Sequence, residues 1–150
     1  MSSAQDYALK LLGHHARSEV ELRKKLEAKG FASDEIDQAI ARLKELRYLD
    51  DEALADSRAE KMVQAERKGP QLAVHKLQAA GIEEERAETA VESAKGGASD
   101  RELALQALEQ RKPALAPDAP RAERYKAARW LAARGFSEET IRDVLRLDEE

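Results

Sequence analysis

Cysteine is absent from this chain of 150 residues. Disulfide bonds, thiolate metal sites and cysteine nucleophiles are therefore excluded, and a reducing compartment is compatible with the composition. Long apolar runs are also absent, because none approaches the roughly 20 residues that a membrane-spanning helix needs. Residues 1–10 lack the basic-then-apolar order of a secretory signal peptide. The sequence therefore predicts a soluble, cytoplasmic protein without membrane contact.

Aromatic residues are scarce, at 4%, whereas charged residues make up 37% of the chain. A compact core usually needs more aromatic bulk, so this composition favours thin helical layers with much exposed surface. No segment shows the polar–apolar alternation of a half-buried strand, and we expect no sheet. The composition indicates an elongated all-α protein with several small cores.

The net charge is −4, which argues against a generic basic nucleic-acid-binding protein. The charge is unevenly distributed, because residues 1–47 and 121–146 are mildly basic and residues 48–100 are acidic. Such local excesses are typical of solvated helix faces as well as of binding surfaces. The charge pattern alone leaves both interpretations open.

One short helical pattern occurs three times along the chain. In each copy a leucine lies four residues before a glycine, and an apolar residue follows the glycine. The three glycines are Gly30, Gly81 and Gly135, and the three leucines are Leu26, Leu77 and Leu131. Repetition at this period is typical of an array of small helical units. Each leucine is expected to lie in the core of its own unit.

Helix signals divide the chain into three units of three helices, which cover residues 1–47, 48–97 and 98–150. Side chains that accept hydrogen bonds from helix N-termini stand at several expected helix starts. These predicted N-caps are Ser18, Ser33, Asp50, Ser99 and Ser137. The repeated glycines suit left-handed C-caps, and Gly69-Pro70 suits a further helix start. Pro113, Pro117 and Pro120 predict a linker inside the third unit.

Five motifs occur in one order along the chain. They are Arg17-Ser18-x-x-Glu21-Leu22, Lys29-Gly30-Phe31, Tyr48-Leu49-Asp50-Asp51, Lys68-Gly69-Pro70 and Arg134-Gly135-Phe136-Ser137. Together they make residues 7–147 resemble the RecX family, which comprises bacterial regulators of the RecA recombinase. The resemblance implies an all-helical fold of three tandem three-helix units and a function without catalysis.

The same resemblance implies what the partner is. Members of the family bind RecA filaments on DNA, lie along the filament groove, and inhibit or modulate strand exchange, ATP hydrolysis and co-protease activity. The chain is therefore expected to act in homologous recombination, DNA repair and the SOS response. We expect a monomer that needs no cofactor and has weak direct affinity for single- or double-stranded DNA.

Residues suited to catalysis or metal binding are few. The three histidines, His14, His15 and His75, are not accompanied by further ligands at metal-binding spacing. Helix capping explains Asp50 and Asp51 better than a catalytic carboxylate pair does. No glycine-rich phosphate loop of the Walker or Rossmann type occurs. The sequence predicts no catalytic, cofactor-binding or metal-binding residue.

Basic side chains on two predicted helices are the candidate partner-binding residues. They are Arg23, Lys24, Lys25 and Lys29 before Gly30, and Arg124, Arg129, Trp130 and Arg134 before Gly135. The cations can equally belong to solvated helix faces. Trp130 lies about 100° round the helix from the core position Leu131. It either staples its helix to a neighbour, as buried aromatic residues do, or anchors a partner, as tryptophan beside arginine does at interfaces.

Three functions are compatible with these features. A filament regulator would bridge neighbouring subunits through several weak patches whose combined avidity exceeds any one of them. A stand-alone DNA-binding helical module is the alternative, because three-helix units resemble helix-turn-helix domains in size. The net charge argues against that alternative, since strong non-specific DNA binding usually needs a clear basic footprint. A helical scaffold for another partner is the third possibility.

Overall fold

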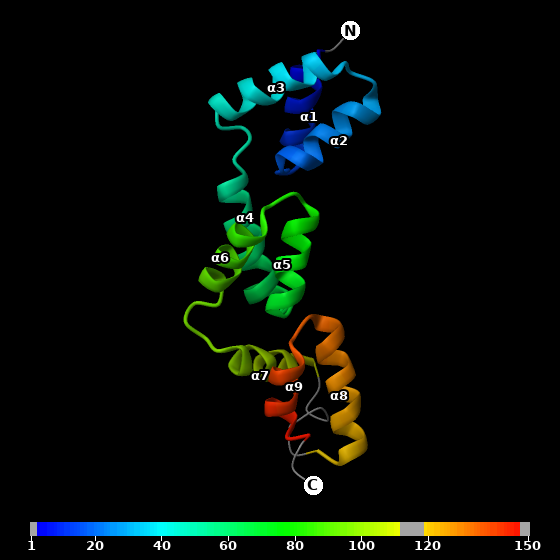
Figure 1. Ribbon diagram of the computed structural model, residues 1–150, viewed down its shortest axis with the longest axis vertical. Coiled ribbons are helices and arrows are strands. Elements are labelled where there is room, and N and C mark those ends of the chain that lie inside the picture. The colour runs from blue at the N-terminus through cyan, green and yellow to red at the C-terminus, as the bar shows by residue number, and fades with distance from the viewer. Residues whose placement is uncertain (1–2, 112–118, 148–150) are drawn as a thin grey trace.

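Figure 1 shows an elongated array of helices in the computed structural model, with the first and last helices at opposite ends. The structure describes residues 3–111 and 119–147. Within these ranges the chain forms nine α-helices, one π-helical turn and no strand. The predicted all-α fold, an elongated array of three tandem three-helix repeats, is confirmed.

The helices follow one another in three units. The first unit contains α1 (Ala4–His14), α2 (Glu19–Lys29) and α3 (Ser33–Glu45). The second unit contains α4 (Asp51–Glu60), the π-helical turn η1 (Lys61–Ala65), α5 (Pro70–Ala79) and α6 (Glu84–Ala94). The third unit contains α7 (Asp100–Arg111), α8 (Arg121–Arg134) and α9 (Glu138–Leu145). In the described residues, extensive helix–helix contacts occur between helices of the same unit. The exact unit boundaries after residues 47 and 97 stay predictions.

Most of the predicted N-caps are confirmed. Ser18 and Glu21 form a complete capping box. The expected backbone hydrogen bond is also accepted by the side chains of Asp50, Ser99 and Ser137. The prediction for Ser33 is wrong, because Ala32 occupies the N-cap position and Ser33 is already helical. At all three repeated glycine turns the N-cap is the second residue after the glycine, and after Gly30 that residue is Ala32. Of the predicted linker, Pro113 and Pro117 lie outside the described residues, and Pro120 is the N-cap of α8.

The second unit contains a local departure from regular helix. The turn Lys61–Ala65 continues α4 as a π-helix, in which each hydrogen bond spans one residue more than in an α-helix. Met62 and Val63 are both buried there. The wider turn thus lets two consecutive apolar side chains reach the core.

Two separate apolar cores stabilise the array. One lies within the first unit and is closed by Leu49, and its largest fully buried side chains are Leu22, Leu26, Ile36 and Leu43. The other extends without interruption through the second and third units. Leu77 and Leu131 both belong to it. Leu26 therefore lies in a core of its own unit, as expected, whereas the expectation of separate cores for Leu77 and Leu131 is wrong.

Three helices, one from each unit, run head to tail along one side of the molecule (Figure 1). The C-terminus of α8 meets the N-terminus of α5, and the C-terminus of α5 meets the N-terminus of α2. We call α8, α5 and α2 the helix column. At each of its two junctions, a helix N-terminus is seated on a repeated glycine turn.

The first junction joins α2 to α5. The Ser18 hydroxyl, at the N-cap of α2, donates a hydrogen bond to the Ala80 carbonyl, and this contact is buried. The Val20 side chain lies directly on Gly81, because a Cβ atom added to Gly81 would overlap it. Gly81 has a φ of 96°, which also favours glycine.

The second junction joins α5 to α8 in the same way. The Gly69 amide, at the N-cap of α5, donates to the Arg134 carbonyl at 2.7 Å. The Gln71 amide donates to the Gly135 carbonyl at 3.1 Å. Leu72 lies on Gly135 as Val20 lies on Gly81, because an added Cβ atom would overlap it.

Candidate partner-binding surface

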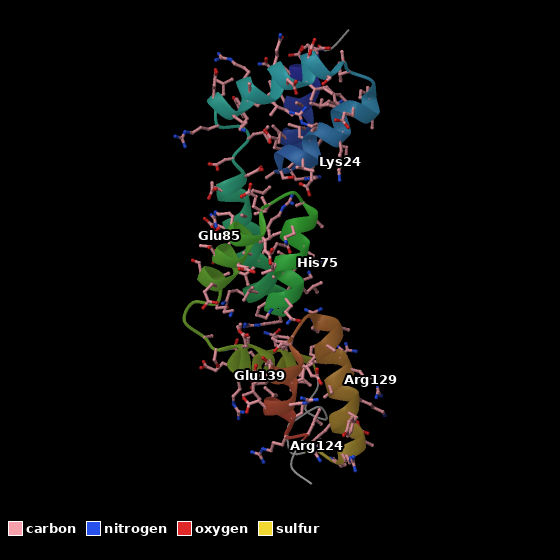
Figure 2. All side chains as sticks on the ribbon, in the orientation of Figure 1. Lys24, His75, Glu85, Arg124, Arg129 and Glu139 are labelled. Atoms are coloured by element: carbon pink, nitrogen blue, oxygen red, sulfur yellow. The ribbon has the colours of Figure 1, made fainter. Side chains whose placement is uncertain are left out.

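The helices of the column carry four exposed cations. They are Lys24 and Lys25 on α2, Lys76 on α5 and Arg129 on α8. No described residue forms an ion pair with any of these four side chains. Figure 2 shows Lys24, His75 and Arg129 along the same long edge of the molecule. We call Lys24, Lys25, Lys76 and Arg129 the basic strip.

Acidic side chains gather on other helices. Figure 2 shows Glu85 and Glu139 on the opposite edge from Lys24 and Arg129. Their helices, α6 and α9, carry the exposed carboxylates Glu84, Glu85, Glu88, Glu92, Glu138, Glu139 and Asp143. The molecule therefore has two edges of opposite charge, although its net charge is small. An approaching polyanion or acidic protein surface would be attracted to the helix column and repelled by α6 and α9.

Three of the candidate arginines are engaged in contacts within the chain. Arg23 forms an ion pair with Asp37 at 2.7 Å. Arg124 donates to the carbonyls of Leu145 and Arg146 at 3.0 and 2.9 Å, where it caps the C-terminus of α9. These contacts hold the guanidinium groups in place and leave fewer of their donors for a partner.

Arg134 is the third engaged arginine, and it lies beside Trp130. Its Nη2 donates to the Glu66 carbonyl across the second junction. The Trp130 ring is half-buried and packs against the shared core, which is the stapling role that the sequence left open. The guanidinium carbons of Arg111 and Arg134 lie 5.8 and 5.6 Å from the ring centroid, within cation–π range. The sequence did not indicate Arg111, which lies on a different helix.

Lys29 lies about one turn after Lys25, at the C-terminal end of α2. Its Nζ atom is 5.2 Å from the centroid of the Tyr7 ring. The Tyr7 and Phe31 rings are tilted against each other with centroids 6.0 Å apart. This aromatic pair forms the surface beside the Gly30 turn.

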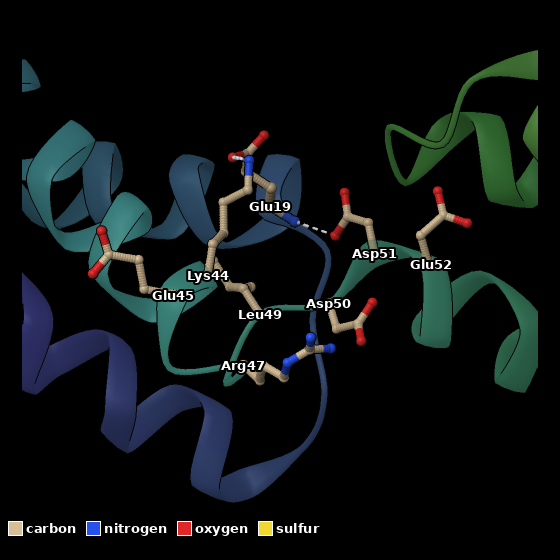
Figure 3. A pocket seen from close by; sticks show the side chains of 8 residues that line it. All are labelled: Glu19, Lys44, Glu45, Arg47, Leu49, Asp50, Asp51 and Glu52. Carbon is tan, nitrogen blue, oxygen red and sulfur yellow. Dashed lines mark hydrogen bonds and ion pairs between the residues drawn. The ribbon is translucent and has the colours of Figure 1, made fainter.

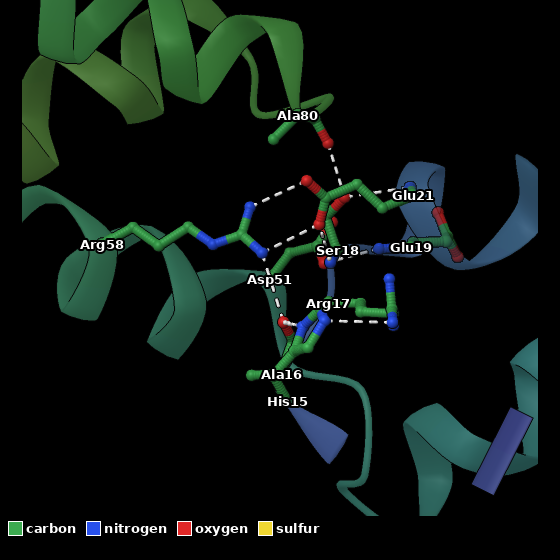
Figure 4. A network of polar contacts seen from close by, with 9 residues as sticks. All are labelled: His15, Ala16, Arg17, Ser18, Glu19, Glu21, Asp51, Arg58 and Ala80. Carbon is green, nitrogen blue, oxygen red and sulfur yellow. Dashed lines mark hydrogen bonds and ion pairs between the residues drawn. The ribbon is translucent and has the colours of Figure 1, made fainter. Parts of the chain in front are cut away.

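A polar network surrounds the first junction (Figure 4). Arg58 of α4 donates to both carboxylate oxygens of Glu21 at 2.9 Å, and also to the Ala16 carbonyl at 3.2 Å. The Glu19 amide donates to Asp51 at 3.0 Å. Together with the buried Ser18 bond, these contacts connect the first two units through charged and hydroxyl side chains.

Two carboxyl groups of this network have shifted pKa values. Partial burial raises the pKa of Glu21, but the hydrogen bonds from Arg58 and from the Ser18 amide outweigh it and leave the pKa below its ordinary value. Burial raises the pKa of Asp51, and the neighbouring Glu19 carboxylate raises it further. The two groups therefore respond to acid in opposite directions.

A pocket of about 400 Å³ lies where α3 leads into α4 (Figure 3). Its lining carries both signs of charge, with Lys44 and Arg47 facing Glu19, Asp50 and Asp51. In the described ranges no three His, Asp or Glu side chains form a group that could hold a metal ion. The same ranges contain no helix both long and apolar enough to span a membrane.

Sequence reasoning found the basic helices but missed two parts of this surface. Lys76 was missed because the middle segment is acidic as a whole, although this lysine is exposed on a column helix, where it lines a pocket with Glu21 and Glu66. The acidic edge was missed although carboxylates at helical spacing, such as Glu84, Glu88 and Glu92, were a readable signal. The connection between units could not be read from local pattern.

Family models match two parts of the chain. Residues 4–43 match the model described as "RecX, first three-helix domain". Residues 99–145 match the model described as "RecX, third three-helix domain". The matched ranges contain α1 to most of α3 and α7 to α9, which include both ends of the helix column.

Curated relatives match nearly the whole chain. The regulatory protein RecX of Chlorobaculum tepidum is 36% identical over 146 residues, which cover 97% of this chain and 88% of the relative. A regulatory protein RecX of Thermus thermophilus is 33% identical over 149 residues, covering 99% and 94%. A crystal structure of RecX from Lactobacillus salivarius superposes with a TM-score of 0.76 at 25% identity, covering 97% and 94%.

Proposed function

The chain belongs to the RecX family of regulatory proteins, and from this premise we propose that it regulates RecA by binding along the recombinase filament through its helix column. Binding would inhibit or modulate the filament's ATP hydrolysis, strand exchange and co-protease activity. The observation that supports this proposal most directly is the basic strip, which extends over all three units and forms no ion pair with the described residues.

The shape of the molecule fits a partner with repeated subunits. The exposed cations of the basic strip lie on three successive helices of the column. Several weak contacts on one array bind a repeating lattice more tightly than each contact alone, because every further contact forms at high effective concentration. We therefore propose that the chain spans more than one filament subunit as a monomer.

Regulation by binding does not require catalysis, and we propose that the chain is not an enzyme. Among the described residues, those lining the pockets of mixed charge include no nucleophile paired with a base. The residues proposed to contact the partner are those of the basic strip (Lys24, Lys25, Lys76 and Arg129) and Lys29, with Arg23, Arg124, Trp130 and Arg134 on the two end helices, α2 and α8.

The first experiment measures ATP hydrolysis by a bacterial RecA on single-stranded DNA, titrated with this protein well below one molecule per RecA subunit. A change in the hydrolysis rate at this ratio is the expected result, because one array would act on several subunits. An unchanged rate up to equimolar protein would refute filament regulation.

A charge-reversal variant tests the surface. Lys24→Glu, Lys25→Glu and Arg129→Glu together should abolish the effect on ATP hydrolysis while helicity by circular dichroism stays unchanged. The matched control reverses Arg42, Arg101 and Arg142, which lie outside the column and make exposed ion pairs of small energetic value. The control should keep the effect; equal loss in both variants would mean that net charge rather than the basic strip is responsible.

The DNA-binding alternative predicts a different result. Titration of the protein onto DNA without RecA, at two salt concentrations, would then show tight binding that falls steeply as salt increases. Under the filament proposal, binding to DNA alone is weak at both concentrations.

A further inference from the structure

One of the three repeated glycine turns carries no helix among the described residues. Gly81 and Gly135 are covered by Val20 and Leu72, whereas a Cβ atom added to Gly30 would meet nothing within 4 Å. Gly30 is exposed and has the same left-handed conformation, with a φ of 99°. The helix column therefore ends at a turn of the kind that seats a helix N-terminus at both internal junctions.

The surface beside this turn is shaped to receive an additional element. A groove of about 800 Å³ lies between α1 and the loop from α2 to α3. Tyr7, Phe31 and Ala32 line it together with Gly30 itself, and Lys10 and Lys29 stand among its charged residues. The aromatic pair gives an inserted apolar side chain a surface to pack against.

The internal junctions define the chemistry of the missing element. At each, a donor at the helix N-cap bonds the carbonyl one residue before the glycine, and the donors are the Ser18 hydroxyl and the Gly69 amide. At each, an apolar side chain in the first turn lies on the glycine. The carbonyl end of α2 also carries the negative end of its dipole, which attracts the positive end of another helix.

A second copy of this chain does not supply such an element. Among the described helices, only α2 and α5 have a large apolar residue at the second or third position, and both are already seated on turns. At the opposite end of the column, α8 starts with Pro120, which has no amide hydrogen, followed by Arg121, Ala122 and Glu123. Within the described residues no helix of a second copy is left to fill the turn, which favours an occupant from another protein.

We propose that the Gly30 turn docks a helix N-terminus of a RecA filament subunit, one with a hydrogen-bond donor at its N-cap and an apolar residue two or three positions later. The inference rests on the proposed function and adds a second contact region to the basic strip. The docked helix would continue the column by one member with the geometry of its two existing junctions.

The test places a side chain where the docked helix would lie. Gly30→Asn introduces asparagine, which tolerates a left-handed backbone conformation. The C-cap is therefore kept while the new side chain fills the docking position. Gly97→Asn is the matched control, because Gly97 has a φ of 86° and open space but follows no column helix. Ala32→Arg is a second blocking variant at an exposed N-cap that makes no side-chain capping bond.

Binding of fluorescently labelled protein to RecA filaments on single-stranded DNA is measured by anisotropy, with thermal melting as the check on folding. Gly30→Asn and Ala32→Arg should each weaken binding about tenfold or more, which is the range of interface hot spots. Gly97→Asn should bind as the unchanged protein does.

The outcomes separate the two proposals. If the unchanged protein does not bind filaments, the proposed function fails. If it binds and both blocking variants bind equally well, the docking inference alone is overturned. Sedimentation of the protein without RecA adds a third readout: self-association that Gly30→Asn abolishes would show that a second copy occupies the turn, and would also overturn the inference.

Discussion

The first and second junctions of the column each seat a helix N-terminus on a glycine turn, but their surroundings differ. Around the first junction, Arg58, Glu21, Asp51 and Ser18 form polar contacts between two units that have separate apolar cores. Around the second, backbone hydrogen bonds combine with one apolar core that both units share. One docking geometry is thus stabilised by electrostatics in one place and by hydrophobic burial in the other.

Because of this difference, the two junctions should respond differently when the units they join move apart. The first junction can open while α1–α3 keep their own core. The second cannot open without exposing apolar side chains that stabilise both units, and apolar burial is the dominant favourable term in folding. We expect the first junction to be the hinge of the array.

The largest effect should come from a charge in the shared core. Leu131→Asp buries a carboxylate and should cost more than about 4 kcal/mol, unfolding α4–α9 together while α1–α3 stay protected. Leu26→Asp should unfold α1–α3 alone. Amide hydrogen exchange resolved by segment measures both. Loss of protection confined to α7–α9 in Leu131→Asp would show that the cores are separate after all.

Alanine at the glycine turns should rank next. Gly135→Ala and Gly81→Ala combine left-handed strain of about 1–2 kcal/mol with an overlap onto Leu72 or Val20 that adds about 1–3 kcal/mol. Gly30→Ala has the strain alone, because nothing lies near its added Cβ atom. Chemical denaturation of the three variants gives the comparison. Equal losses at all three positions would contradict the seating of helices on Gly81 and Gly135.

Removing the ionic contact at the first junction should have a smaller effect. Glu21→Gln leaves Arg58 without its charged partner, and because both side chains are about one-third exposed the loss should be about 1 kcal/mol or less. The expected result is a larger radius of gyration by small-angle X-ray scattering with unchanged helicity. Glu138→Gln, which removes the exposed pair with Arg142, is the control and should change neither quantity.

Lowering the pH should have the smallest effect on the opening of the first junction. Because the folded pKa of Glu21 lies below its ordinary value, its contribution is present above about pH 4.3 and is lost as the pH falls through the folded pKa. The raised pKa of Asp51 opposes this, since its cost appears as the pH rises and is relieved in acid. Asp51→Asn should therefore make the acid-induced expansion steeper, as measured by scattering. A shallower response in this variant would reverse the assigned signs.

Local features of this fold could be predicted from the sequence, because they depend on neighbouring residues. The capping box at Ser18 and the left-handed turns at Gly30 and Gly135 involve partners within a few positions. The error at Ser33 is also local, since the preceding turn decides where the helix starts. The helix positions in each unit follow from such short-range signals, whereas the π-helical turn Lys61–Ala65 was not predicted.

Connections between units could not be predicted, because their partners are far apart in the chain. Ser18 and Ala80 are separated by 62 positions, and Arg58 and Glu21 by 37. Ser18 was identified only as an N-cap, although its hydroxyl also bonds the next unit. The cations of the basic strip were found in part, since Lys24 and Arg129 lie on basic helices while Lys76 lies in an acidic segment.

The head-to-tail order of α8, α5 and α2 gives the molecule a polarity. One end of the column is an N-terminus and the other a C-terminus, so the array is not the same when it is turned around. A filament of identical subunits also has a direction. On such a filament the chain can match its contacts in one orientation only, and its two ends then face unlike neighbours. A single asymmetric molecule would in this way distinguish the two directions along the filament.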